Sequence, residues 1–233
     1  MGSENAAIKL YTNHGCPWAH RAHITLAELG LSFEEEIIDL SVPRTPEYLK
    51  VNPRGLVPSL SYNGEIFTES AIVAQFLADT YPSHLLPASS DPKGPRTRAR
   101  IAFFVDAWFS KCNSVYTKTW QAKAEDEAGE LADSLVKVVV KEIEPLLQDA
   151  GPFFGGSNKL TFAEVLTAPF VLRLKVFAKH GLLPAGLLTA FAEQAPNFHK
   201  WSEAVIKSPS VTGIFDEDLL VEKMKVRIAK AKE

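Results

Sequence analysis

Cys16 is the residue of this sequence best placed to act as a nucleophile. It stands between a β-prone run, 8–12, and an amphipathic segment, 17–29, and Pro17 follows it directly. Because proline suits the first position of a helix, Cys16 is predicted to be the N-cap, where the amides of Trp18 and Ala19 are free to donate to its sulfur. The positive end of a helix stabilises a thiolate, which is the nucleophilic form of cysteine, so we predict a reactive thiol. The alternative is a structural cysteine buried in the core.

This thiol has no resolving partner nearby in the sequence. A dithiol oxidoreductase carries its second cysteine three residues after the first, and Ala19 occupies that position here. We therefore expect an outside small thiol to resolve a mixed disulfide at Cys16, with Cys112 as the less favoured alternative. Two cysteines are too few for a disulfide framework, which predicts a reducing compartment, the cytoplasm.

Two further motifs point to a ligand with a peptide-like backbone. Val57-Pro58 opens a predicted strand, and a cis bond there turns the N–H and C=O of Val57 outward to pair with an extended ligand. An ordinary edge proline is the alternative. Glu69-Ser70 begins a helix, whose free amides and Ser70 hydroxyl suit a carboxylate while Glu69 suits an ammonium group. A plain helix cap is the alternative for this second motif.

The elements that must position these residues follow from changes in hydrophobic period. The order is strand, helix, strand, helix, strand, strand, helix, over 8–12, 17–29, 32–39, 46–51, 57–62, 65–68 and 69–81. A helical crossover makes the first strands parallel, whereas Asn63-Gly64 makes the last two an antiparallel hairpin. We predict a mixed four-stranded sheet in a domain of residues 5–85.

The second half of the chain reads at helical period throughout. A linker rich in proline, 82–95, precedes predicted helices at 96–121, 126–149, 161–180, 184–193, 196–207 and 214–231. Thr161 and Glu164 have the spacing of a capping box, flanked by Leu160 and Val165 at the positions of a hydrophobic staple. The predicted fold class is α/β plus all-α, with an all-helical second domain over residues 95–230.

Three motifs in this order resemble those of the cytosolic glutathione transferase family, in its cysteine-type, omega-like branch. They are the sequences CPWA at 16–19, NPRGLVP at 52–58 and ESAI at 69–72, and the likeness extends over essentially the whole chain. The resemblance implies a thioredoxin-like first domain, a homodimer and glutathione as co-substrate, without a metal. It also implies a second substrate that is hydrophobic or carries a disulfide.

The resemblance assigns roles to the motif residues. Cys16 forms the mixed disulfide with glutathione, Val57 of the Val57-Pro58 pair binds the cysteinyl backbone, and Glu69 and Ser70 hold the γ-glutamyl end. Trp18, beside the thiol, is a further binding residue. For the glycine carboxylate, Arg44, Lys50 and Arg54 lie in the right region; Arg44 is our choice, and the other two stay open.

These residues predict a glutathione-dependent thiol transferase or reductase that removes glutathione from mixed disulfides and has dehydroascorbate reduction as a related activity. One alternative is conjugation of glutathione to electrophiles, with Tyr11, Asn13 or Cys16 stabilising the glutathione thiolate. Another is a ligand-carrying or regulatory protein without catalysis.

Two other patterns have plainer explanations that we favour. Cys16, His20 and His23 share one face of the predicted helix near His14, but a metal there would quench the thiolate, so we predict no metal. Arg21, one turn into the same helix, is expected to affect the thiolate little. Aromatic residues and Cys112 recur every four residues from Phe104 to Trp120, and the middle ones either line a pocket above Cys16 or belong to the core.

Charge and hydropathy argue against two classes of partner. The 25 basic and 28 acidic residues give a net charge of −3, which provides no basic field for nucleic acid. No apolar run approaches the roughly 20 residues of a spanning helix, so a membrane partner is not expected.

Overall fold

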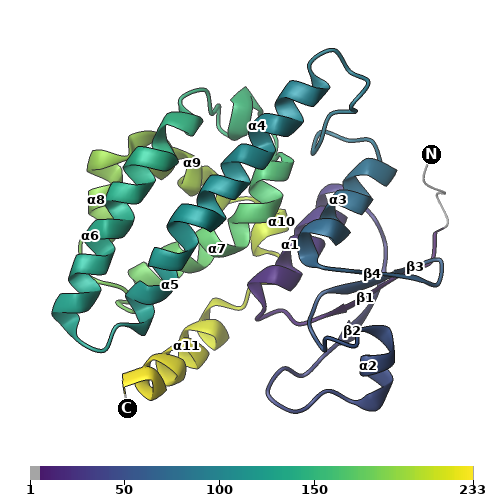
Figure 1. Ribbon diagram of the computed structural model, residues 1–233, viewed down its shortest axis with the longest axis horizontal. Coiled ribbons are helices and arrows are strands. Elements are labelled where there is room, and N and C mark those ends of the chain that lie inside the picture. Colours follow the sequence, from purple (N-terminus) through teal and green to yellow (C-terminus); the bar gives the residue numbers. More distant parts are fainter. Residues whose placement is uncertain (1–5, 233) are drawn as a thin grey trace.

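The computed structural model describes residues 6–232 and contains a sheet domain followed by a helical domain (Figure 1). The predicted first boundary, residue 5, lies just outside the described residues. The elements of the sheet domain are β1 (Ile8–Thr12), α1 (Pro17–Glu28), β2 (Glu34–Ile37), α2 (Pro46–Val51), β3 (Ser59–Tyr62), β4 (Glu65–Thr68) and α3 (Ser70–Thr80). This order confirms the predicted one.

The sheet is mixed, as predicted, with strand order β2-β1-β3-β4. Strand β1 pairs in parallel with β2 and antiparallel with β3, and β3 forms the hairpin with β4. The hairpin turn has Asn63 at φ 52° and Gly64 at φ 88°, as expected of an Asn-Gly turn in which both residues adopt positive φ. Figure 1 shows α1 and α3 on one side of this sheet and α2 on the other.

Successive side chains of β1 point to opposite faces of the sheet and pack against the helices on each side. Leu10 is fully buried opposite Leu60 of β3, in a cluster with apolar residues of α1 and α3. Tyr11 points to the other face, where its ring lies 5.8 Å from that of Tyr48 on α2. Both faces of the sheet are therefore covered, and the carboxyl end of β1 leads directly to Cys16.

The helical domain is assembled around one buried helix, α7 (Phe162–Lys179), which contacts α1, α4, α8, α9, α10 and α11. Its other elements are α4 (Gly94–Ala107), a π-helical turn (Trp108–Cys112), α5 (Asn113–Gln121), α6 (Glu125–Glu142), α8 (Leu187–Gln194), α9 (Pro196–Val205), α10 (Pro209–Thr212) and α11 (Glu217–Lys232), with 3₁₀ turns at Glu144–Leu147 and Phe154–Gly156. None of the helices in residues 6–232 combines the length and apolarity needed to span a bilayer.

Three helix boundaries differ from the prediction by three residues or more. Helix α6 ends at Glu142 instead of continuing to residue 149, and Pro145, which has no N–H to donate, lies in the 3₁₀ turn that follows. Helix α8 begins three residues late, after Gly186 at φ 86°. The short helix α10 was not predicted, and α11 begins after it at Glu217 instead of residue 214. The domain boundaries at 85 and 95 stay predictions; α3 ends at Thr80 and α4 begins at Gly94.

The four-residue stripe lies in the core. Phe104, Trp108, Cys112, Tyr116 and Trp120 are all buried in the helical domain. A straight α-helix would turn successive members by about 40°. The π-helical turn at Trp108–Cys112 takes more residues per turn, which offsets this drift. The alternative in which the middle residues line a pocket above Cys16 is therefore wrong.

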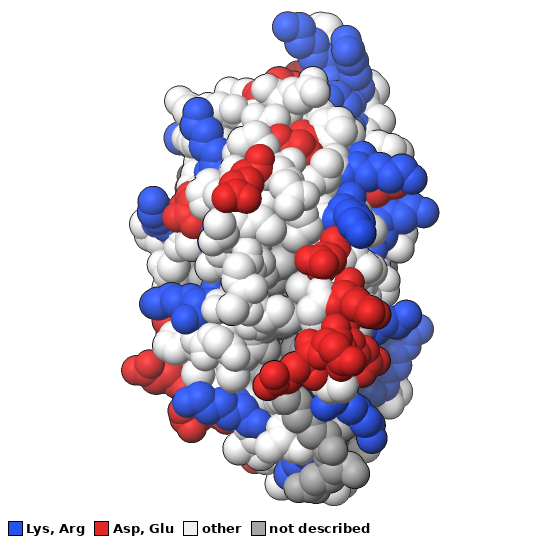
Figure 2. All heavy atoms as spheres, turned by 90° about the vertical axis from the view of Figure 1, so that its left-hand side faces the viewer, with Lys and Arg blue, Asp and Glu red and all other residues white. Residues whose placement is uncertain are grey.

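One face of the helical domain shows how its charges are distributed. Figure 2 shows Lys and Arg beside Asp and Glu along both margins of a largely uncharged band. This face therefore carries charges of both signs.

Candidate functional site

Cys16 lies where the sequence predicts it, in the loop between β1 and α1. It is the N-cap of α1 in extended conformation, Pro17 is the first helical residue, and the Cys16 amide donates to the carbonyl of Asn13 at 3.0 Å. One detail of the prediction is wrong, because the sulfur accepts no hydrogen bond from the amides of Trp18 and Ala19. The half-buried side chain of Cys16 instead borders two cavities.

The first cavity brings the predicted binding residues together. It has a volume of about 360 Å³. Its lining includes all seven of the residues singled out in the sequence, which are Cys16, Trp18, Arg44, Val57, Pro58, Glu69 and Ser70. These residues come from the β1–α1 loop, the start of α1, the segments before and after α2, and the start of α3.

The second cavity is bordered by Cys16 and by the C-terminal helix. It measures about 710 Å³ and is lined by the β1–α1 loop, the start of α1, residues 39–41 and one face of α11. Leu220 and Met224 give α11 an apolar face there, and Lys223 and Arg227 give it a basic edge. Cys16 and Trp18 line both cavities, so a ligand in each can meet at the sulfur.

Two backbone features shape the first cavity. The Val57-Pro58 bond is cis, which confirms the prediction over the ordinary edge proline. Glu69 is the N-cap of α3 at φ 68°, in the region that residues other than glycine rarely adopt. Strained backbone of this kind clusters at ligand sites, which agrees with a binding role for Glu69. Its side chain forms an ion pair with Arg54.

The three basic candidates for a carboxylate have different positions. Arg44 lines the cavity, but its guanidinium also donates to the carbonyls of Asp39 (2.7 Å), Val42 and Gly55 (3.0 Å). Arg44 therefore fixes the loop after β2 as well as facing the cavity. Lys50 and Arg54 are not among the lining residues of this cavity.

Two buried arginines next to this site have no carboxylate partner among the described residues. Arg21 is 4% exposed and packs over the rings of Trp18 and Phe109, with its centre 4.6 Å from each centroid. It donates to Ser70 Oγ at 3.0 Å. Burial lowers the pKa of Arg21 to about 9, and attraction to Cys16 opposes that shift. The small effect of Arg21 on the thiolate stays a prediction.

Arg173 of α7 is the second buried arginine, and the sequence analysis did not identify it. Its guanidinium donates to the carbonyl of Gly15 at 3.2 Å, next to Cys16, and to that of Pro169 at 2.8 Å. Burial lowers its pKa to about 10, and attraction to Tyr116 and Cys16 opposes that shift. A signal was available, because an arginine within the largely apolar segment 162–177 needs a specific partner if it is buried.

Arg173 is expected to hold in place the loop that carries Cys16. We expect Arg173→Met to slow alkylation of Cys16 by iodoacetamide about tenfold, because losing the hydrogen bond to the Gly15 carbonyl lets the sulfur move away from the start of α1. Arg173→Lys should recover most of the rate. The measurement is peptide mass spectrometry over time, with Arg100→Met, an exposed ion-pair residue, as control. Equal rates in Arg173→Met and the unmodified chain would contradict this role.

Cys16, His20 and His23, which share one face of the predicted helix, do not form a metal site in the structure. His20 turns into the helical domain, where its ring stacks on Phe215 and its Nδ1 lies 3.3 Å from Arg173. Burial lowers the pKa of His20 well below its usual value. Among the described residues, His23 instead lies close to His14 and Glu35, with one potential ligand atom of each within 4.8 Å of the others.

The chain combines a thioredoxin-like domain, which has a single thiol at the start of its first helix, with a helical domain. Residues 15–80 match the family model "Glutathione S-transferase, N-terminal domain". The chain is 28% identical over 212 residues to glutathione S-transferase omega-1 of Rattus norvegicus, covering 89% of this chain and 80% of the relative. It is also 28% identical over 214 residues to the probable glutathione S-transferase GSTU1 of Oryza sativa subsp. japonica, covering 86% and 88%.

A solved structure agrees with these relatives. Glutathione transferase Omega 2C from Trametes versicolor superposes with a TM-score of 0.81 at 29% identity, over 97% of this chain and all of that one. The chain is therefore similar to glutathione transferases over most of its length, and omega-class proteins are among the relatives.

Proposed function

We propose that this chain is a glutathione-dependent thiol transferase that works through a mixed disulfide between Cys16 and glutathione. The observation that carries the proposal is the position of Cys16, at a helix N-terminus and between two cavities. The other cysteine does not compete, because Cys112 is fully buried and burial raises the pKa of its thiol to about 12. The resolving thiol then comes from a second glutathione.

The first cavity is the proposed glutathione site. Its cis Val57-Pro58 segment supports binding of the cysteinyl backbone by Val57, and the start of α3 supports binding of the γ-glutamyl end by Glu69 and Ser70. Trp18 contributes a wall beside the sulfur. Arg44 is the proposed residue for the glycine carboxylate, since it is the basic side chain that lines this cavity.

The proposed reaction has two thiol–disulfide exchanges. The Cys16 thiolate attacks the glutathionyl sulfur of a mixed disulfide, the original S–S bond breaks, and the other thiol leaves and takes a proton from solvent. A second glutathione thiolate then attacks Cys16–S–SG, which releases oxidised glutathione and restores the Cys16 thiolate. For dehydroascorbate, the related substrate, two glutathiones supply the two electrons and again end as oxidised glutathione.

The second cavity is the proposed site for the part of the substrate that is released. Its size and the apolar side chains of Leu40, Leu220 and Met224 suit a hydrophobic or disulfide-bearing molecule.

Conjugation of glutathione to an electrophile remains the second candidate, but the structure favours Cys16 over its other proposed residues. The Asn13 amide is used in the loop, where it accepts from the Gly15 amide and donates to the carbonyl of Ile38. Tyr11 packs against Tyr48 and lines neither cavity.

Incubation with oxidised glutathione tests the proposed nucleophile. We expect one glutathione adduct per chain, on the peptide that contains Cys16, because this thiolate is accessible and Cys112 is buried. Intact and peptide mass spectrometry measures the adduct, and Cys112→Ala serves as the control that should still be modified. An adduct confined to Cys112, or none at all, would overturn the assignment.

We also propose a homodimer and a cytoplasmic location, as the family resemblance and the cysteine content suggest. A groove of about 690 Å³ between α3 and α4, which includes the exposed Ile72, supports a second copy docking on this face.

A further inference from the structure

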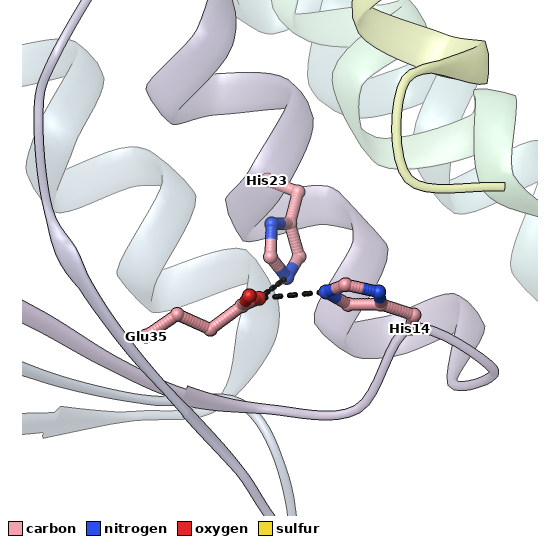
Figure 3. Close-up of side chains that lie close together, drawn as sticks. All are labelled: His14, His23 and Glu35. Carbon is pink, nitrogen blue, oxygen red and sulfur yellow. Dashed lines mark hydrogen bonds and ion pairs between the residues drawn. The ribbon is translucent and has the colours of Figure 1, made fainter.

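Three potential metal ligands from separate elements converge outside the two cavities that Cys16 borders. Figure 3 shows His14 of the β1–α1 loop, His23 of α1 and Glu35 of β2 with their side chains pointing toward one another. Glu35 Oε1 lies 2.7 Å from His14 Nε2 and 3.4 Å from His23 Nε2. One ligand atom from each residue lies within 4.8 Å of the other two.

We propose that His14, His23 and Glu35 form a binding site for a divalent transition-metal ion, with Zn²⁺ as the best match. Two imidazole nitrogens and one carboxylate are a ligand set that Zn²⁺ uses in sites that keep a position open for water or substrate. Bonds of about 2.0–2.2 Å from a tetrahedral ion place the ligand atoms a little over 3 Å apart. The observed separations require only small side-chain movements to reach that arrangement.

The surroundings of the three residues suit an ion that enters from solvent. His23 is 5% exposed and its ring packs edge-on against Phe33, which holds one ligand in a fixed position. His14 and Glu35 are partly exposed and form the outer side of the site. The ring of His14 lies edge-on to that of His23, with centroids 5.3 Å apart. Solvent therefore has access to the positions that the protein leaves open.

One existing hydrogen bond limits the affinity. Thr12 Oγ1 lies 2.8 Å from His23 Nε2, the atom that would bind the metal, and Thr12 is fully buried. Binding replaces this hydrogen bond and also the one between His14 Nε2 and Glu35 Oε1. We therefore expect a weaker site than a closed structural zinc centre, in which no such contacts are lost.

The site is distinct from the thiol site. None of the three residues lines either cavity that Cys16 borders. They are connected through the chain, since His14 precedes Cys16 by two residues in the loop. A bound ion would tie that loop to α1 and β2.

The experiment must keep the thiol from binding the metal itself. In untagged, full-length protein carrying Cys16→Ser, we expect calorimetry to detect one equivalent of Zn²⁺, and Co²⁺ to give a visible spectrum without sulfur charge-transfer bands. His14→Ala and Glu35→Gln, both at the surface, should each weaken binding at least about tenfold. His84→Ala is the matched control, because His84 pairs with Glu28 at 2.9 Å with no third ligand among residues 6–232, and the variant should leave binding unchanged.

Because His23 is buried, it is followed by imidazole NMR instead of substitution. Zn²⁺ should shift the ring-nitrogen signals of His14 and His23 together in the Cys16→Ser protein. No Zn²⁺ binding in that protein, affinity retained in His14→Ala and Glu35→Gln, or an unchanged His23 ring would each overturn the proposal.

Discussion

Cys16→Ser is expected to lower turnover of a glutathione mixed disulfide by at least about a thousandfold, equivalent to about 4 kcal/mol in the reaction barrier. A serine hydroxyl is a much weaker nucleophile at neutral pH and cannot form the disulfide intermediate. The measurement is oxidised glutathione produced per enzyme per second. The matched control is Cys112→Ala, which leaves the accessible thiol in place and should retain activity in its folded fraction.

A glutathione-binding measurement on Cys16→Ser shows whether the variant has lost only the reactive thiol or also the binding site. The Cys16→Ser protein should still bind glutathione in calorimetry, because the contacts proposed for the cysteinyl backbone and the γ-glutamyl end do not involve the sulfur. Undiminished turnover in Cys16→Ser would contradict the proposed mechanism. Strong activity toward an aryl halide that survives the substitution would instead favour conjugation.

The first cavity was predictable because its residues lie in local motifs. Cys16 before Pro17 marks a helix start, Val57-Pro58 marks a strand start, and each motif needs only its immediate neighbours to be recognised. The mixed sheet then brings these starts together, because β1 is central and lies between β2 and β3. Local signals thus determined the elements and the motif residues of the cavity, whereas the choice of Arg44 came from the resemblance to a known family.

The groups that were missed depend on contacts between distant segments. Arg173 reaches the carbonyl of Gly15 across 158 positions of sequence, and only the packing of α7 against α1 brings the two together. Glu35 joins His14 because β2 pairs in parallel with β1, and the sequence does not give the orientation of side chains at that edge. Neither arrangement has a spacing rule that a single sequence reveals.

The capping box of α7 was predictable from its spacing, but the other hydrogen bonds of Glu164 were not. Thr161 and Glu164 form the predicted box, with the Glu164 carboxylate accepting from the amide and hydroxyl of Thr161 at 2.7 Å. The same carboxylate also accepts from the amide of Phe154 at 2.8 Å and from the indole N–H of Trp201 at 2.6 Å. Glu164 therefore joins the start of α7 to a 3₁₀ turn and to α9, which the box motif alone does not predict.

Glu164→Ala is expected to lower the free energy of unfolding by at least about 3 kcal/mol, because it leaves several buried donors without an acceptor. For a chain of this size that corresponds to a fall in Tm of roughly 10 °C. Burial raises the pKa of Glu164, and the hydrogen bonds from Thr161, Trp201 and Phe154 oppose that shift by favouring the carboxylate. Thermal and urea unfolding followed by circular dichroism measure the change.

Two control variants distinguish the loss of the Glu164 hydrogen bonds from effects of helix propensity and of side-chain volume. Glu193→Ala, at an exposed position of α8, should change the free energy of unfolding by less than about 0.5 kcal/mol. Glu164→Gln keeps the volume but turns an N–H₂ group toward donors, so its loss should fall between those of the two alanine variants. If Glu164→Ala unfolds at the same temperature as the unmodified chain, the four hydrogen bonds do not hold the helical domain together.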